Sequence, residues 1–97
     1  MSLISPDTWG VDVRPSIEWL EELVKELGFD LARREIQVCA RALAGLTRNG
    51  IALDLDLKPP TVATLSQRAY HKLNISHLNE LFTLCLRALT VRHHSKD

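Results

Sequence analysis

The chain has 97 residues, in which 12 lysines and arginines balance 12 aspartates and glutamates. This length predicts one domain with a modest hydrophobic core. No run approaches the roughly 18 consecutive apolar residues of a membrane span, and the N-terminus lacks a signal peptide's basic and apolar regions. We therefore expect a soluble, cytoplasmic protein without a membrane partner.

The zero net charge conceals an asymmetry between two parts of the chain. Residues 1–30 hold seven acidic and two basic side chains, a net charge of −5. Residues 31–97 hold five acidic and ten basic side chains, a net charge of +5. A basic part of this kind favours contact with nucleic acid.

An irregular leader and one helix are expected before the basic part. Residues 1–14 show no usable period, whereas the spacing over 15–27 predicts a helix that Gly28 ends. We expect Trp9 and Trp19 to anchor this helix on the domain. The spacing would also suit a coiled-coil seam, which fewer than two heptads cannot sustain alone. The apolar stripe consists of Ile17, Leu20, Leu23, Val24 and Leu27.

A second helix is expected over 31–44. Asp30 is placed to cap its N-terminus, and Gly45 is placed to stop its C-terminus. Its predicted buried face consists of Ile36, Cys39, Ala40 and Leu43.

Residues 47–73 predict two helices joined by a tight turn. Thr47 is placed to cap the first helix, which ends near Leu55, and the period breaks over 56–60. The apolar stripe of the second helix is Val62, Leu65, Ala69 and Leu73. Its opposite face is polar, free of acid, and consists of Thr64, Gln67, Arg68 and His71, with Lys72 on the flank. Two short helices of this kind are typical of a helix-turn-helix.

The last helix is expected over 76–89 and is apolar on more than one stripe. Since a single domain this small buries only one face of a helix, the second stripe implies self-association. The stripe expected to face the core is Leu78, Phe82, Cys85 and Leu89. The stripe expected to face a second copy is His77, Leu81, Leu84 and Ala88.

These elements predict an all-α fold, a small helical bundle that contains a helix-turn-helix and has an extra N-terminal helix. The acidic leader and its helix occupy 1–29, the helix-turn-helix domain occupies 30–90, and 91–97 form a disordered tail.

No set of residues points to catalysis. The chain contains no Gly-rich phosphate loop and no nucleophile at a suggestive spacing from a base. The spacing of Cys39 and Cys85 suits no zinc motif, so we expect buried free thiols. We expect no enzymatic activity, no cofactor and no metal site.

Residues 31–81 also carry a set of matching positions in one register. These are Leu31, Arg34–Glu35, Val38, Ala44–Gly45, Thr47, Ile51–Ala52, Leu55, Thr61–Val62, Lys72–Leu73, Ile75 and Glu80–Leu81. The set resembles the LuxR/FixJ-type (GerE-like) DNA-binding domain of bacterial transcriptional regulators.

The resemblance implies sequence-specific binding of double-stranded DNA by a homodimer on a pseudo-palindromic site. Such domains usually follow a sensor or receiver domain, which these 97 residues do not contain. We therefore expect either a piece of a longer regulator, whose sensor or receiver domain would be a further partner, or a small stand-alone regulator. The implied base contacts are Ala63, Thr64 and Gln67, of which the amide of Gln67 suits adenine. The expected phosphate contacts are Thr47, Arg48, Lys58, Thr61, Arg68, His71 and Lys72.

Several positions depart from the family pattern. The family's usual basic residue after Thr-Val is Ala63 here, and its usual Glu before Ile-Ala is Gly50. A His or Tyr is replaced by Leu65, and the Ser that caps the recognition helix is replaced by Lys58. These departures leave an alternative open, a divergent helix-turn-helix used for protein contacts with weak or no DNA binding.

The charge asymmetry supports one regulatory hypothesis. If the acidic face of residues 16–27 lies near the recognition helix, it acts as an electrostatic brake on DNA binding. If it packs on the far side of the domain, it contributes only stability.

Overall fold

The computed structural model describes residues 15–28 and 30–94, the last three by their backbone alone. Within this part the chain forms five helices and no strand, which confirms the all-α prediction. They are α2 (Ile17–Lys25), α3 (Arg33–Leu43), α4 (Arg48–Leu55), α5 (Pro59–Leu73) and α6 (Leu78–His94). None of these helices is long and apolar enough to cross a membrane.

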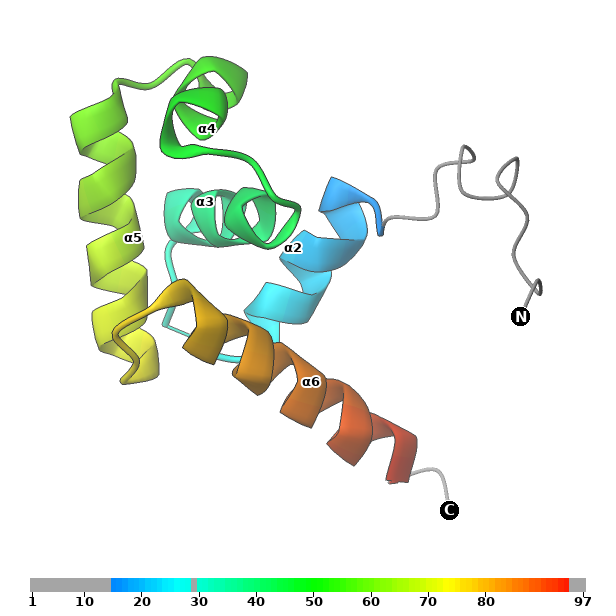
Figure 1. Ribbon diagram of the computed structural model, residues 1–97. Coiled ribbons are helices and arrows are strands. Elements are labelled where there is room, and N and C mark those ends of the chain that lie inside the picture. Colours follow the sequence, from blue (N-terminus) through cyan, green and yellow to red (C-terminus); the bar gives the residue numbers. More distant parts are fainter. Residues whose placement is uncertain (1–14, 29, 95–97) are drawn as a thin grey trace, which may run out of the picture.

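Helix α3 lies at the centre of the bundle (Figure 1), because it contacts each of the other four helices. α4 and α5 lie on one side of it and α2 on the other, while α6 crosses one end. α2 therefore packs on the side of α3 that faces away from α5.

Two small cores hold this arrangement. One joins α3, α4 and α5 and consists of Val38, Ile51, Ala52, Leu55 and Val62. The other joins α2, α3, α5 and α6 and consists of Val24, Cys39, Ala69 and Leu81. Val38 and Cys39 are neighbours on α3 and belong to different cores, so α3 contributes side chains to both halves of the bundle.

Most helix ends are explained by the capping residues at the ends themselves. Thr47 Oγ1 accepts a hydrogen bond of 3.0 Å from the backbone N–H of Gly50, as predicted for the cap of α4. Asn74 ends α5 in a left-handed conformation, with φ of 59°.

The predicted cap of α3 is wrong. The N-cap is Ala32 rather than Asp30, and it has no side-chain oxygen. Glu35 satisfies a different amide, because its Oε1 accepts the backbone N–H of the N-cap residue Ala32 itself at 2.8 Å, which is the second half of a capping box.

The predicted tryptophan anchor of α2 is also wrong. Trp19 is 40% exposed, whereas Leu20, Leu23 and Val24 are buried against the domain. Trp9 lies outside the described residues.

Helix α6 differs most from expectation. It continues to His94, past residue 90 where the domain was predicted to end. Leu81, predicted to face a second copy, is fully buried, whereas Phe82 is 44% exposed. The reason is geometric: the helix has two overlapping apolar stripes, and the direction from which α3 and α5 approach decides which one is covered. Leu81 and Cys85 form the buried stripe.

Candidate nucleic-acid interface

The helix-turn-helix is formed by α4, a short turn and α5. Asp56 leaves α4 in a left-handed conformation with φ of 58°, and the N–H of Leu57 donates to the carbonyl of Ala52 at 2.8 Å. Pro59 and Pro60 occupy the first turn of α5, where a missing N–H costs little. The turn is thus sharp, and it packs α5 against α4 at Val62.

The three predicted base-contacting residues lie within two turns of α5. Thr64 and Gln67 are exposed, and Ala63 is half-buried. The Thr64 hydroxyl donates to the carbonyl of Pro60 at 3.1 Å, so its donor is used within the helix. Gln67 is exposed and lines a shallow groove together with Arg68 and His71.

Most of the predicted phosphate contacts also lie on the surface. Arg48 begins α4, Lys58 precedes α5, and Arg68 lies on α5; all three are exposed. None of them forms an ion pair within the part of the chain that the structure describes. Thr47, Thr61 and His71 are exposed as well. Cations without an ion pair therefore lie at both helices of the helix-turn-helix, and within the described residues Arg33, Arg34 and Arg87 outside it are also exposed and form no ion pair.

Lys72 does not fit the predicted phosphate role. Its Nζ lies 2.8 Å from Glu35 Oε1 and donates to the carbonyl of Asp30 at 3.0 Å. The ammonium group is already neutralised inside the fold, where it fixes the end of α5 to the start of α3. We therefore correct the assignment of Lys72 from phosphate contact to structural ion pair.

The partner of Lys72 is Glu35, a buried carboxylate that is 3% exposed. Burial alone would raise the pKa of this carboxyl. Hydrogen bonds from Lys72 and from the N–H of Ala32, with the positive charges of Lys72 and Arg68, hold its pKa below the usual value. The acid three residues after Ala32 is the sequence signal for this role, because an acid at that position of a capping box accepts the N–H of the N-cap residue.

Arg41 is a second internal cation that sequence reasoning missed. Its Nη1 lies 2.9 Å from Glu21 Oε2 of α2 and donates to the carbonyl of Gln37 at 3.0 Å, while its Nε pairs with Asp54 of α4. Burial would lower the pKa of this guanidinium, but the hydrogen bonds to Asp54 and Glu21 raise it. One acid of the leader is thus used to join α2 to the domain.

A further polar hollow of about 360 Å³ lies at the C-terminal end of α5. It extends the polar surface from Gln67 past the end of the helix to Ser76. The remaining lining residues are Tyr70, His71, Asn74 and Ile75.

Comparison with known proteins bears on this site. The family model described as "Bacterial regulatory proteins, luxR family" matches residues 30–85, more than half of the chain. No curated protein and no solved structure matches the chain. The matched region covers α3, α4, α5 and the first half of α6, and leaves α2 outside. The resemblance over residues 31–81 is confirmed, and the chain belongs to the luxR family of bacterial regulatory proteins, a family of DNA-binding transcription regulators.

Proposed function

We propose that α5 lies in the major groove of double-stranded DNA and reads its sequence there, with Ala63, Thr64 and Gln67 towards the base edges. The observation that carries this proposal is that some basic residues form ion pairs within the fold and others do not. Arg41 and Lys72 are neutralised inside the fold, whereas Arg68 on the outer face of α5 has no ion pair in the described chain.

Cations at both helices of the motif contact the DNA backbone. Arg48, Lys58 and Arg68 are exposed and contact phosphates, with Thr47, Thr61 and His71 as further hydrogen-bonding partners. In a plot of the logarithm of the binding constant against the logarithm of the salt concentration, each neutralised phosphate adds about −0.9 to the slope.

The chain acts on a pseudo-palindromic site as a homodimer. Each copy supplies the half-buried Leu84 and Ala88 of α6 and the exposed His77, which directly precedes the helix, as the pairing stripe. One helix per subunit buries little area, so the dimer is weak without DNA or a sensor or receiver domain. This function implies a cytoplasmic location.

The test is a titration of labelled duplex DNA, selected from a random pool, over a series of salt concentrations. Arg68→Ala should weaken binding to every sequence and reduce the salt slope by about one unit. Lys25→Ala, which removes a cation from α2 on the far side of α3, is the matched control and should leave the slope unchanged.

An absence of binding at low salt would reject DNA reading. It would favour the alternative, a divergent helix-turn-helix that binds proteins. Equal slopes for Arg68→Ala and the wild type would instead show that Arg68 meets no phosphate.

A further inference from the structure

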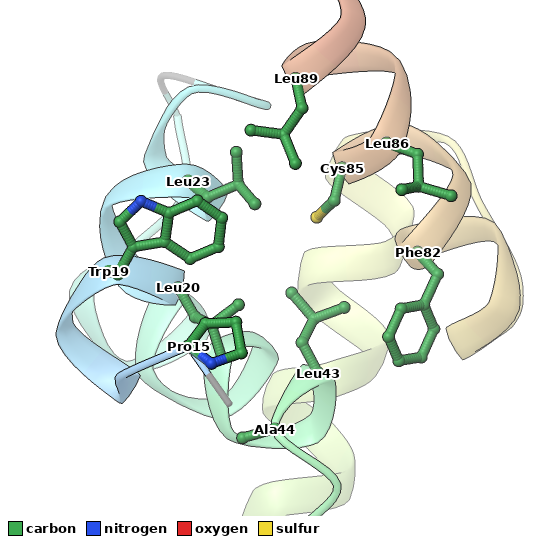
Figure 2. A pocket seen from close by; sticks show the side chains of 10 residues that line it. All are labelled: Pro15, Trp19, Leu20, Leu23, Leu43, Ala44, Phe82, Cys85, Leu86 and Leu89. Atoms are coloured by element: carbon green, nitrogen blue, oxygen red, sulfur yellow. The ribbon is translucent and has the colours of Figure 1, made fainter. Parts of the chain in front are cut away.

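An apolar groove of about 340 Å³ lies between α2 and the second half of α6 (Figure 2). Three of its lining residues are large and exposed, Trp19 at 40%, Phe82 at 44% and Leu86 at 65%. The other lining residues are Pro15, Leu20, Leu23, Leu43, Ala44, Cys85 and Leu89. A continuous apolar surface of this kind marks a place where other apolar groups bind.

The two walls of the groove come from α2 and α6, which both pack on α3 (Figure 1). The groove is separate from the DNA-reading face, which lies on α4 and α5. α2 and the residues Leu86 and Leu89 also lie outside the region that the family model matches. The groove is therefore a feature of this chain beyond the shared domain.

The lining of the groove indicates a protein partner and not a small molecule. Sites for small molecules combine an apolar lining with a few polar groups that fix the orientation of the ligand. None of the ten lining side chains, all in the described part of the chain, carries a charge, an amide or a hydroxyl group. Exposed aromatic side chains such as Trp19 and Phe82 are instead typical anchors of protein interfaces.

The rim of the groove on α2 is acidic. Glu22 lies three residues after Trp19, so it borders Trp19 on the helix surface, and Glu18 lies one turn before Glu22. Both glutamates are exposed. Glu22 forms an ion pair of 2.9 Å with Lys25, but both side chains of this pair are exposed, so it competes only weakly with a cation of a partner.

The rim on α6 is neutral beside Leu86. Thr83 and Thr90 lie three residues before and four residues after Leu86, and both are exposed. Their hydroxyls donate to carbonyls of the same helix, at 3.1 Å to Asn79 and at 2.9 Å to Leu86. A partner in the groove therefore meets acidic groups on the α2 flank and neutral groups on the α6 flank.

We propose that the groove between α2 and α6 binds an amphipathic helix of a partner protein. The apolar face of that helix lies in the groove, and lysines or arginines lie on its flank towards α2. Helices bind apolar grooves through side chains spaced three, four and seven residues apart. The basic flank complements Glu18 and Glu22, which selects this partner against an acidic one.

A second copy of the chain is a poorer occupant of the groove. In a symmetric pair each copy contributes the same surface, so two acidic rims would meet in one small interface. Like charges placed together in this way are unfavourable. The charge of the rim therefore favours a basic partner over self-association at this surface.

Two synthetic peptides of about 15 residues, which form about four helical turns, test the proposal on the isotope-labelled full-length chain. Both peptides carry leucines at helical spacing on one face, and they differ only in one flank, which has lysines in one peptide and glutamates in the other. With the lysine peptide, the NMR signals of the Trp19 indole and the Leu86 amide should shift. Its affinity should exceed that of the glutamate peptide by about fivefold at low salt, and Glu18→Gln/Glu22→Gln should remove this difference.

A pair of leucine variants tests the apolar part of the contact. Leu86→Ser should weaken binding of the lysine peptide by about tenfold, because the peptide loses an apolar contact in the groove. Leu53→Ser is the matched control, because Leu53 is 84% exposed on α4, outside the groove, and it should leave the affinity unchanged. Both leucines are exposed, so neither substitution removes a core side chain.

The absence of any shift at Trp19 and Leu86 at about 1 mM peptide would overturn the proposal. Equal affinities of the two peptides for the wild type, or of the two serine variants for the lysine peptide, would do the same. Shifts of these signals on dilution of the free wild type would assign the groove to a second copy and reject the partner helix. Nuclear Overhauser contacts between the Trp19 indole and residues before Pro15 in the free chain would assign the groove to the chain itself and reject it as well.

Discussion

Single basic residues in this chain differ in role according to what their helix packs against. Arg68 and Lys72 lie one helical turn apart on α5, and the sequence alone assigned both to phosphates. Lys72 instead meets Glu35, because α3 brings that carboxylate to the end of α5. Which of two neighbouring cations is neutralised depends on the placement of a helix 37 residues away in the chain, and this placement could not be obtained from local periodicity.

The ion pair between Lys72 and Glu35 leads to a prediction about stability. Lys72→Met should lower the free energy of unfolding at neutral pH by about 2–3 kcal/mol, because it leaves a buried carboxylate without its cation. This expected loss is smaller than the usual cost of breaking a fully buried ion pair, because the Lys72 side chain is about a third exposed. Arg68→Met is the matched control and should change stability by less than about 0.5 kcal/mol. Chemical denaturation of both variants measures the difference.

The same pair predicts a dependence of stability on pH. The pKa of Glu35 lies below its usual value of 4.5, so its stabilising contribution is complete above that value and is lost as the pH falls through the lowered pKa. In Lys72→Met the difference from the wild type should shrink in acid, because a protonated Glu35 no longer needs a cation. A difference that stays constant from neutral pH to acid would contradict this account.

For the residues expected to contact bases, we predict a change in sequence preference without a change in non-specific affinity. Gln67→Ala or Thr64→Ala should relax the preference at one base pair by about 1–3 kcal/mol and leave binding to non-cognate DNA unchanged. Sequence selection with each variant checks this prediction. If both variants select the wild-type site with unchanged preference, the base-reading assignment is wrong.

At the scale of helices, the buried face of a helix could be predicted from the sequence only where its apolar and polar residues lie on clearly separate faces. α5 has one apolar stripe, and Val62 and Ala69 are buried as expected. α6 has apolar residues around most of its surface, so a wheel cannot choose between the stripe of Phe82 and that of Leu81. Only the angle at which α6 crosses α3 decides, and that angle depends on contacts distant in the chain.

The corrected orientation of α6 sharpens the prediction about pairing. With Leu81 buried, the residues left for a second copy on the predicted stripe are His77, Leu84 and Ala88. Ala88→Glu should abolish self-association, because it puts a charge into a small apolar contact. Leu86→Glu, which lies on the groove beside α2, is the control and should preserve it. Sedimentation over a concentration series measures both, and loss of pairing in the control alone would move the interface to the groove.

At the scale of the molecule, the sequence shows that the acidic and basic residues lie in separate parts of the chain. It does not show where the acidic helix packs relative to α5. The leader helix is joined to the domain by Glu21 and Arg41 and by three buried side chains, Leu20, Leu23 and Val24. α3 stands between this helix and the outer face of α5. A helix is about 10 Å thick, which is about one Debye length at 0.1 M salt. The remaining acids of α2 are therefore screened from DNA bound at α5.

This geometry yields a prediction that separates an electrostatic brake from a packing role. Glu18→Gln/Glu22→Gln removes two exposed acidic charges from α2 and should change DNA affinity by less than about twofold at 0.1 M salt. Deletion of residues 1–28 should lower stability strongly, because it removes Val24 from the core that Cys39, Ala69 and Leu81 share. Binding titrations and denaturation on the same preparations measure the two effects. A marked gain in affinity for the double variant, with its stability unchanged, would show that the leader restrains DNA binding by its charge and that packing is not its main role.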